Sequence, residues 1–236
     1  MIVNIDVKGL EVVCAAFLSK DPVLYNELNN GADIHSDNQA KFGLPDRITA
    51  KIFKFKLLYG ALEYSFANDP DFTFISRSEN YWKKVIDKYY EKYVGIARWH
   101  NQIANEVLKT GMYVSPFGRM YKWDRVSGSK LPLTQIKNYP VQGYGADIVS
   151  IARCSLFRRW QNASIRGCLV STVHDSIVFD IDTRDVDKCV DLCNNVFIDL
   201  PSNINNIFNV KFDLKINIEI SVGDDMYNLK EIKYGN

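Results

Sequence analysis

The 236-residue sequence lacks the long apolar segment of a membrane protein. Its longest strictly apolar run, residues 12–18, is far shorter than the ~20 residues that a membrane-spanning helix requires. The N-terminal residues MIVNIDVKG also lack the basic-then-apolar order of a secretory signal peptide. These absences predict a protein that has no membrane partner and works in the cytoplasm.

Cysteine is scarce and is not spaced for a disulfide framework. The five cysteines form no CxxC pair, and Cys189 and Cys193 lie four residues apart with no partnering pair. This pattern favours buried, reduced thiols in a reducing compartment.

An excess of charge of either sign is absent as well. Lys and Arg number 29 against 28 Asp and Glu, so the net charge is +1. Overall charge therefore does not identify a nucleic-acid-binding protein, although a local basic face suffices for phosphate contact. With 47% hydrophobic and 24% charged residues, the composition is that of an ordinary folded protein of one large or two small domains.

Hydrophobic periodicity predicts an α+β fold, with helices packed on one side of a small antiparallel sheet. Strands are expected over residues 1–7, 167–173 and 212–221, with hairpins over 112–123 and 171–180. Helices are expected over residues 9–18, 22–28, 46–60, 78–109, 136–161 and 183–198. Gly95 is expected to divide the stretch over 78–109 into two helices.

The predicted helix over 46–60 has cations on one face and apolar residues on another. Its apolar face is expected to consist of Ile48, Ile52, Phe55 and Leu58. A different face is expected to carry Arg47, Lys51 and Lys54. Cations at this spacing most often form a solvated surface, so the helix alone does not establish a binding site.

Two predicted strands end in carboxylates. Asp6 follows the strand residues IVNI, and Asp175 interrupts the β-forming run STVHDSIVFD. A buried carboxylate without a partner is costly, so a compensating group is expected. Carboxylates at adjacent strand ends suit Mg²⁺, and two such ions can hold the attacking and leaving oxygens of a phosphoryl transfer. A lone strand-end aspartate more often caps a turn.

Three stretches of the sequence resemble, in order, motifs A, B and C of family A DNA polymerases, the bacterial DNA polymerase I group with its phage and mitochondrial relatives. They are DVKGLEVVCAA (6–16), RITAKIFKFKLLYG (47–60) and STVHDSIVFD (171–180). Intervening stretches that also resemble the family are DIH (33–35), residues 81–119 ending in FGR, and NYPVQGYGADI (138–148). The resemblance covers nearly the whole chain, and its spacing Arg-x3-Lys-x7-Tyr-Gly is highly specific.

The resemblance implies a template-directed DNA polymerase that uses two Mg²⁺ ions. Asp6 and Asp175 would be the metal ligands, together with the backbone carbonyl of Val7. The charge of the metals would then compensate the two carboxylates. Arg47, Lys51 and His35 would be implied to hold the triphosphate of the incoming deoxynucleotide. Lys51 would also be catalytic, because a positioned cation stabilises the leaving pyrophosphate.

The resemblance also implies roles in the sugar pocket and along the primer–template DNA. Phe55 would pack on the nucleotide sugar, Tyr59 would stack at the templating base, and Glu11 would exclude a 2′-hydroxyl group. The implied DNA contacts are Gln142 and Asn138 in the minor groove, His174 near the primer end, and Arg119 on the backbone.

Several positions depart from the pattern of the family. Ser176 stands where motif C often has Glu, which removes a third carboxylate from this position. Motif A usually has Ser and Gln where Lys8 and Gly9 stand, and often Arg where Val13 stands. Motif B commonly has Gly where Lys56 stands.

The resemblance implies a polymerase hand reduced to an antiparallel-sheet palm and helical fingers. The palm is expected over residues 1–30 and 131–236. The fingers are expected over 31–130, with a return hairpin near 112–123. Family members carry a thumb and usually a 3′–5′ exonuclease before motif A, which begins here at Asp6. A separately encoded partner with a thumb, and possibly an exonuclease, is therefore expected. The segment KNYPVQG favours a phage-type source and hence a location in the host cytoplasm.

Three alternative hypotheses remain at this point. A single-subunit RNA polymerase shares His-Asp-Ser in motif C, but Glu11 and Phe55 argue against it. A non-catalytic, nucleic-acid-binding remnant is disfavoured because both carboxylates and both phosphate-binding cations, Arg47 and Lys51, are intact. The chain could also be a fragment of a longer gene product.

Overall fold

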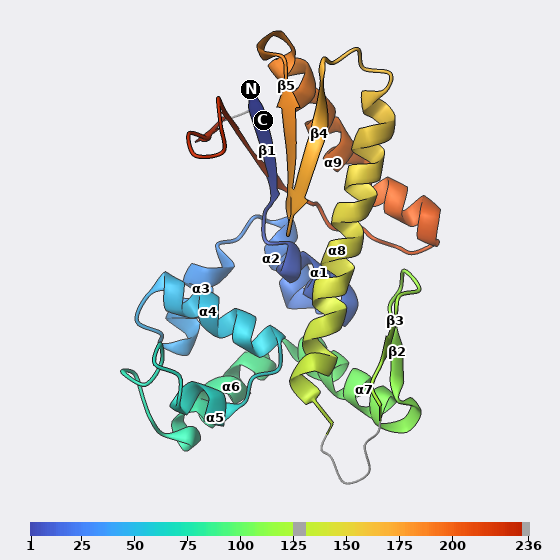
Figure 1. Ribbon diagram of the computed structural model, residues 1–236. Coiled ribbons are helices and arrows are strands. Elements are labelled where there is room, and N and C mark those ends of the chain that lie inside the picture. The colour runs from blue at the N-terminus through green and yellow to red at the C-terminus, as the bar shows by residue number, and fades with distance from the viewer. Residues whose placement is uncertain (125–130, 233–236) are drawn as a thin grey trace. The chain divides into compact units, whose positions relative to one another are not determined.

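The computed structural model describes residues 1–124 and 131–232 (Figure 1). The chain divides into two compact units, which we call the sheet unit (Met1–Val13 with Gly143–Asn236) and the helical unit (Cys14–Gln142). The compact units therefore assign residues 14–30 and 131–142 to the helical unit, whereas the predicted palm included them. The division into palm and fingers stays a prediction.

The sheet unit is built on a five-stranded sheet of order β4-β5-β1-β6-β7, in which all neighbours are antiparallel. The strands are β1 (Ile2–Val7), β4 (Gly167–Val173), β5 (Ser176–Ile181), β6 (Ile218–Gly223) and β7 (Lys230–Glu231). Figure 1 shows β1, β5 and β4 side by side. The antiparallel sheet combined with helices confirms the predicted α+β class.

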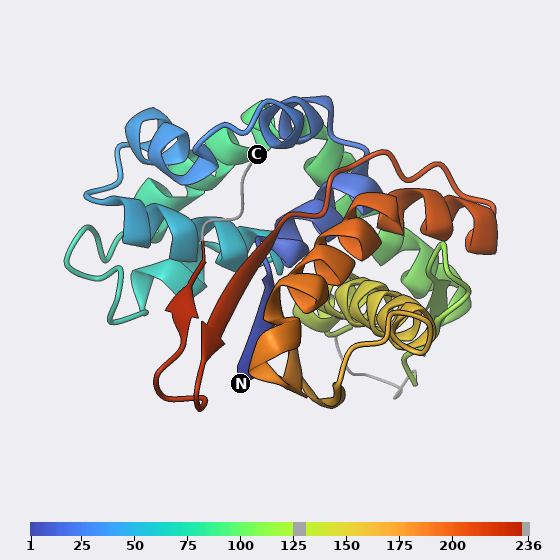
Figure 2. The same cartoon turned by 90° about the horizontal axis from the view of Figure 1, so that it is seen from above.

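The alternation of apolar and polar residues in β1 determines which face of the sheet is covered. Val3, Ile5 and Val7 are buried, whereas Asn4 and Asp6 lie on the opposite face and are half-buried. Helix α9 (Val186–Phe208) packs against β1 and β6 (Figure 2). Successive side chains of a strand point to opposite faces, so burial of Val3, Ile5 and Val7 places Asp6 on the other face.

The helical unit contains most of the helices of the chain and a small hairpin. Its helices are α2 (Pro22–Asn29), α3 (Ile34–Phe42), α4 (Arg47–Leu58), α5 (Glu63–Ala67), α6 (Glu79–Lys92) and α7 (Val94–Thr110). The hairpin consists of β2 (Met112–Val114) and β3 (Met120–Lys122). Two further helices, α1 (Leu10–Ser19) and α8 (Leu133–Trp160), have residues in both units.

A buried carboxylate fixes the start of α7 against the start of α2. Asp21 is fully buried and caps α2 by accepting a hydrogen bond from the Leu24 amide at 2.9 Å. Its other oxygen accepts a hydrogen bond from the Gly95 amide at 2.6 Å. A Cβ atom at position 95 would lie 2.5 Å from the Asp21 Cα, so only glycine permits this approach.

Packed aromatic rings form the core of the helical unit. Phe53 of α4 lies 5.1 Å from Phe66, and Phe66 lies 5.3 Å from Trp82, measured between ring centroids. All three side chains are fully buried. Offset and tilted aromatic pairs at these distances stabilise a core beyond the apolar area that they bury.

The apolar face predicted for α4 is wrong in register. Ile48 is 70% exposed, whereas Lys54, which was expected on the cation face, is completely buried. The buried face instead consists of Thr49, Ala50, Phe53, Lys54, Leu57 and Leu58. Phe53 is the large ring that enters the aromatic core, and a helical stripe centred on it includes Lys54.

Other boundaries differ from the expected ones by a few residues or more. Helix α9 extends to Phe208 rather than residue 198, and Pro201 lies inside it. The last long strand begins at Ile218 rather than residue 212. The break between α6 and α7 falls at Tyr93 rather than Gly95.

Among the helices in residues 1–124 and 131–232, none has the length and hydropathy needed to cross a membrane.

Candidate functional site

The sheet unit brings Asp6 and Asp175 to the same end of its central strands. Asp6 lies near the end of β1, opposite Ser176 of β5. The next amide, that of Val7, donates a hydrogen bond to the backbone carbonyl of Asp175 at 3.3 Å. This bond places the turn that carries Asp175 beside the end of β1. The order of the strands therefore brings Asp6 and Asp175, which are far apart in the sequence, to neighbouring positions in the sheet.

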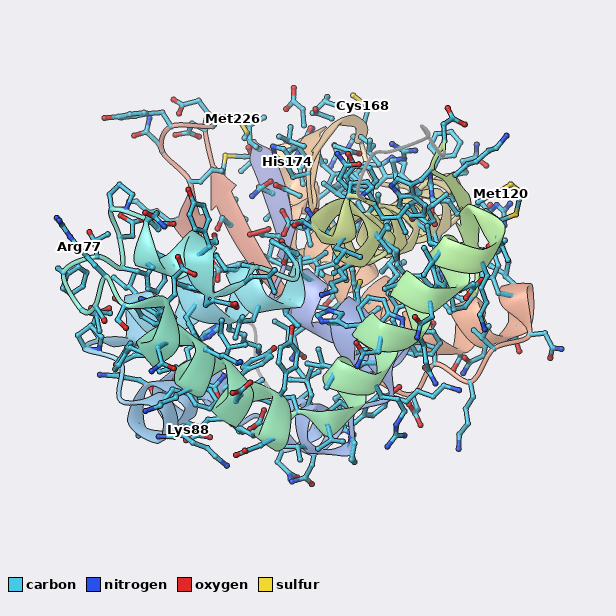
Figure 3. The ribbon with its side chains drawn as sticks, turned by 90° about the horizontal axis from the view of Figure 1, so that it is seen from below. Arg77, Lys88, Met120, Cys168, His174 and Met226 are labelled. Atoms are coloured by element: carbon cyan, nitrogen blue, oxygen red, sulfur yellow. The ribbon has the colours of Figure 1, made fainter. Side chains whose placement is uncertain are left out.

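The turn between β4 and β5 consists of only two residues, His174 and Asp175. His174 has a φ of 55°, in the left-handed region that favours glycine. A side chain in this conformation costs about 1 kcal/mol, which the paired strands on both sides must offset. Ser176 closes the turn by donating its hydroxyl to the Val173 carbonyl at 3.2 Å. His174 is exposed at this turn (Figure 3).

The carboxylates at this end of the sheet act on one another electrostatically. Partial burial raises the pKa of Asp6, and the nearby charges of Asp175 and Glu219 raise it further. Glu219 belongs to β6 and lies directly opposite Asp6 on the other side of β1. Glu11, in the first turn of α1, also adds to the shift of the Asp6 pKa. Four carboxyl groups therefore share this region of the sheet unit.

The sequence did not indicate that Glu219 lies beside Asp6 or that it pairs with Lys8. The Lys8 ammonium lies 3.0 Å from a Glu219 carboxylate oxygen and 3.8 Å from one of Glu231. Lys8 thus offsets part of the negative charge of Glu219 and Glu231, and Asp6 also acts electrostatically on its ammonium group. The alternating pattern KINIEIS could have marked residue 219 as a strand position, but not its neighbour.

The donor set at Asp6 and Asp175 fits Mg²⁺ by its chemistry. Burial and the nearby charge of Asp175 raise the pKa of Asp6, and a divalent cation is the natural compensation for its carboxylate. Across the described part of the chain, no group of three or more His, Cys, Asp or Glu side chains is arranged to hold a metal ion. Mg²⁺ commonly takes only one or two carboxylates and completes its coordination with waters and phosphates, which agrees with a two-aspartate site.

The helical unit gathers cations at the facing ends of α3 and α4. Arg47 is the first residue of α4, and its Nε donates to a carboxylate oxygen of Asp33 at 2.9 Å. Hydrogen bonds from Arg47 and Ser36 hold the pKa of Asp33 below its usual value. Lys51 lies one turn further along α4 and is exposed. Asp33, the residue that orients Arg47, was not anticipated as its partner.

His35 is the neutral member of this cluster. It lies in the first turn of α3 and is half-buried. Burial lowers the pKa of His35 to about 4, and the charges of Lys54, Arg47 and Lys51 contribute to the shift in that order. The imidazole is therefore uncharged near neutral pH, and Arg47, Lys51 and Lys54 act on it electrostatically.

Aromatic side chains continue from this cluster along α4. The ring centroid of Phe55 lies 6.2 Å from that of His35 and 6.4 Å from that of Tyr59. Gln142, on α8, donates its side-chain amide to the Tyr59 hydroxyl at 2.8 Å. Four predicted site residues, His35, Phe55, Tyr59 and Gln142, are thus connected in one continuous series within the helical unit.

The remaining predicted contacts lie elsewhere in the helical unit. Asn138 is half-buried on α8, one turn before Gln142. Arg119 follows the tip of the β2–β3 hairpin and is exposed. Its amide donates to the Ser115 hydroxyl at 3.2 Å, which fixes the backbone of the hairpin end.

The predicted residues thus form two groups, a carboxylate group in the sheet unit and a cationic and aromatic group in the helical unit. A sequence model of the family described as DNA polymerase family A matches residues 1–228. The chain belongs to DNA polymerase family A. The match extends over both units of this family A chain and over all the predicted site residues.

Curated relatives of this family A chain are bacterial DNA polymerases I. It is similar to the DNA polymerase I of Streptococcus pneumoniae strain R6, with 27% identity over 195 residues that cover 77% of this chain and 22% of the relative. It is also similar to the thermostable DNA polymerase I of Thermus aquaticus, with 24% identity over 244 residues that cover 98% of this chain and 27% of the relative. The chain spans about a quarter of the length of these relatives.

Among solved structures, the fold is similar to that of the POL domain of Pol1 from M. smegmatis, described in complex with DNA primer-template and dNTP. The TM-score is 0.79 at 20% identity, and the alignment covers 94% of this chain and 39% of that chain. At this level of identity the likeness establishes the fold of the family A chain.

Proposed function

We propose that this family A chain carries out template-directed DNA synthesis, adding deoxynucleotides to the 3′ end of a primer. The observation that carries the proposal is the pairing of Asp6 and Asp175 at the end of the sheet, joined through the Val7 amide. The charge of Asp175 helps to raise the pKa of Asp6, and two neighbouring carboxylates are suited to hold divalent cations at a phosphoryl-transfer site.

The acidic residues of the sheet unit would bind the metal ions of the reaction. Asp6 and Asp175, with the Val7 carbonyl, are the residues that would hold two Mg²⁺ ions. When bound, Mg²⁺ activates the primer hydroxyl and offsets the charge that develops on the phosphate. Glu11 lies next to this group and, as the proposed sugar gate, would fill the space beside C2′ of the nucleotide. His174, at the adjacent turn, is proposed to contact the primer end.

The cationic residues of the helical unit are proposed to bind the incoming nucleotide. Arg47, oriented by the bifurcated hydrogen bond from its Nε to the two carboxylate oxygens of Asp33, is proposed to bind the triphosphate together with the exposed Lys51. His35 would donate a hydrogen bond from its neutral ring to the same phosphates. Because negative charge grows on the leaving pyrophosphate, the cations stabilise the transition state more than the bound substrate.

The aromatic series supplies the surface for the sugar and the template. Phe55 is proposed to pack on the deoxyribose and Tyr59 to stack at the templating base. Gln142 is held by the Tyr59 hydroxyl and is proposed to contact the minor groove, together with Asn138. Arg119 is proposed to contact the DNA backbone.

A separate chain that carries a thumb, and possibly an exonuclease, is part of the proposal, as is a phage-type source. The partner is supported by strand β4, which pairs on one side only within the described residues. Val170 and Val173 of this strand are each 51% exposed. An edge strand with exposed apolar side chains invites association with another chain. The sequence of the segment KNYPVQG supports the phage-type source.

Primer extension by the Asp175→Asn variant tests the proposed activity. The substitution removes one negative ligand with little change in volume, and we expect the rate to fall by at least ~1000-fold. Asp187→Asn, at an exposed position of α9, is the matched control and should extend primers like the wild type. The assay should be run at low salt, because a chain of net charge +1 binds duplex DNA weakly at higher salt. A wild-type rate in Asp175→Asn would contradict the assignment.

A further inference from the structure

Lys54 is a lysine without a partner inside the helical unit. It belongs to α4, three residues after Lys51 and directly before Phe55, and its side chain is completely buried. Its Nζ has no hydrogen-bond acceptor within residues 1–124 and 131–232. An unpaired ammonium group in a protein interior is strongly unfavourable, so either the charge is absent or a missing anion compensates it.

The groups that face Lys54 from neighbouring elements do not supply this anion. The nearby carboxylate, Glu27 of α2, already pairs with Lys92 of α6 at 2.7 Å and accepts the Tyr93 hydroxyl at 2.9 Å. His35 of α3, which interacts with Lys54 electrostatically, is neutral near pH 7 and supplies no negative charge. Among Lys54, Lys92 and Glu27, two ammonium groups therefore share one carboxylate.

The amide of Asn38 indicates the same shortage of acceptors. Its oxygen accepts a hydrogen bond from Lys92 at 2.6 Å and lies 3.0 Å from the Tyr93 hydroxyl, whose one proton it shares with Glu27. Its amide nitrogen is buried and has no partner within the described ranges, like the Nζ of Lys54. Asn38 and His35 are three residues apart on α3, the helix that packs against α4. The interior between these helices thus holds unpaired donors and too little negative charge.

The charge of Lys54 reaches the proposed triphosphate-binding cluster. Burial lowers the pKa of Lys54 to about 7, with Glu27 opposing the shift and Lys92 adding to it. After burial, Lys54 is the largest contributor to the lowered pKa of His35, ahead of Arg47 and Lys51. Charges separated by protein interior interact more strongly than charges separated by water, so a buried cation can act on a ligand that it does not touch.

We propose that Lys54 is a buried positioning residue for the nucleotide, whose ammonium form is stabilised when a triphosphate binds at Arg47, Lys51 and His35. Binding then takes up a proton from solvent onto the Lys54 Nζ, and no covalent bond to the ligand forms. The inference rests on the proposed nucleotide site. It makes triphosphate affinity depend on pH through a residue that lies outside the site.

The direction of the pH dependence follows from linkage. A polyanion near Lys54 raises its pKa above the value in the free protein, so the bound state holds more protons. Affinity is therefore highest below about pH 7 and falls as the pH rises toward the pKa of the bound state. Each unit by which the ligand raises the pKa corresponds to about a tenfold difference in affinity.

Calorimetric titration of the whole chain with inorganic tripolyphosphate tests the inference at pH 6 and pH 8.5. Two buffers of different ionisation enthalpy at each pH give the number of protons taken up. We expect the wild type to lose about tenfold more affinity between the two pH values than Lys54→Met does. Lys54→Met has no titrating group at this position and therefore gives the baseline for the titration of tripolyphosphate itself and of His35.

Two further variants separate charge from structure. Lys54→Arg remains charged throughout this pH range, so its affinity should change with pH only as much as that of Lys54→Met does. Lys88→Met, at an exposed position of α6, is the matched control and should titrate like the wild type (Figure 3). Equal proton uptake by wild type and Lys54→Met would overturn the inference. So would a pH dependence in Lys54→Arg equal to that of the wild type.

A second measurement distinguishes failure of this inference from failure of the proposed function. The pKa of Lys54 in the free protein can be followed by NMR of labelled lysine side chains. A pKa near the usual 10.5 would overturn the role of Lys54 and leave the nucleotide site standing. Absence of tripolyphosphate binding to the wild type at either pH would contradict the nucleotide site and the inference with it.

Discussion

The sheet unit and the helical unit position their functional residues by different means. In the sheet unit, backbone pairing aligns Asp6 with Ser176 on one side and with Glu219 on the other, and the Val7 amide binds the Asp175 carbonyl. In the helical unit, side chains do this work: Asp33 holds Arg47, and Tyr59 holds Gln142. A ladder of backbone bonds fixes carboxylates rigidly, whereas contacts between exposed side chains leave the cations adaptable.

This difference predicts that the two units govern different kinetic quantities. Carboxylates held on a rigid sheet are suited to the chemical step, which requires fixed geometry. Cations on exposed helix surfaces are suited to capturing a charged substrate from solution. Variants of the two units should therefore separate effects on the rate from effects on nucleotide use.

The largest effect expected in the helical unit concerns its exposed cations. Arg47→Ala and Lys51→Ala would each remove a proposed charge-assisted phosphate contact, and such a loss typically costs ~2–4 kcal/mol or roughly 30- to 1000-fold in kcat/KM. Primer–template affinity should change little. Steady-state kinetics with varied nucleotide, together with a DNA-binding titration, measure both quantities. An equal loss of DNA binding would show that α4 faces the duplex instead.

A smaller effect concerns the stability of the helical unit at low pH. His100 is buried, its Nε2 lies 3.1 Å from the Leu58 carbonyl, and burial lowers its pKa to about 3. The unfolded chain, with a histidine pKa near 6.5, therefore binds a proton that the folded protein does not. Stability contributed by neutral His100 is complete above pH 6.5 and is lost as the pH falls toward 3.

Between pH 7 and pH 5, this linkage should lower the free energy of unfolding by about 2 kcal/mol. Urea unfolding at the two pH values, compared between wild type and His100→Asn, measures the contribution. The variant should be less stable at pH 7 and should show a shallower dependence on pH. Parallel pH profiles for the two proteins would mean that His100 does not titrate as described.

The smallest effects are expected on sugar selectivity, to which each unit is proposed to contribute one residue. Glu11 belongs to the sheet unit and is the proposed sugar gate, and Phe55 belongs to the helical unit and is proposed to pack on the sugar. Glu11→Ala should relax discrimination against ribonucleotides, and Phe55→Tyr should ease acceptance of dideoxynucleotides, each by about tenfold. Competition between natural and modified nucleotides measures both ratios. If neither ratio changes, the sugar pocket is wrongly assigned.

The sequence predicted best those features that depend on local pattern. The α+β class, the helix predicted over residues 22–28 and the hairpin at Asp175 all follow from short-range periodicity and turn chemistry. Glu219 could not be predicted as the neighbour of Asp6, because the order of strands is set by packing among segments distant in the sequence. The roles of Asp6 and Asp175 came from the resemblance to a family, since strand-end aspartates alone are ambiguous.

The burial of Lys54 shows why the face of a short helix is difficult to predict. Ile48 and Phe55 suggested one apolar stripe along α4, and Phe53 with Leu57 defines another. The aromatic rings of Phe66 and Trp82 select the second stripe, and they come from elements later in the chain. Lys54 is buried as a consequence, against its own preference for solvent.

The most direct test of the division between the units is single-turnover incorporation of one nucleotide by Asp6→Asn, measured over a range of nucleotide concentrations. We expect the maximal rate to fall by at least ~1000-fold, because Asp6 would hold a metal at the reacting phosphate. The concentration for half-maximal rate should stay within about threefold of the wild type, since the residues proposed to bind the triphosphate belong to the helical unit. A maximal rate like that of the wild type, or a defect confined to the half-maximal concentration, would contradict this account.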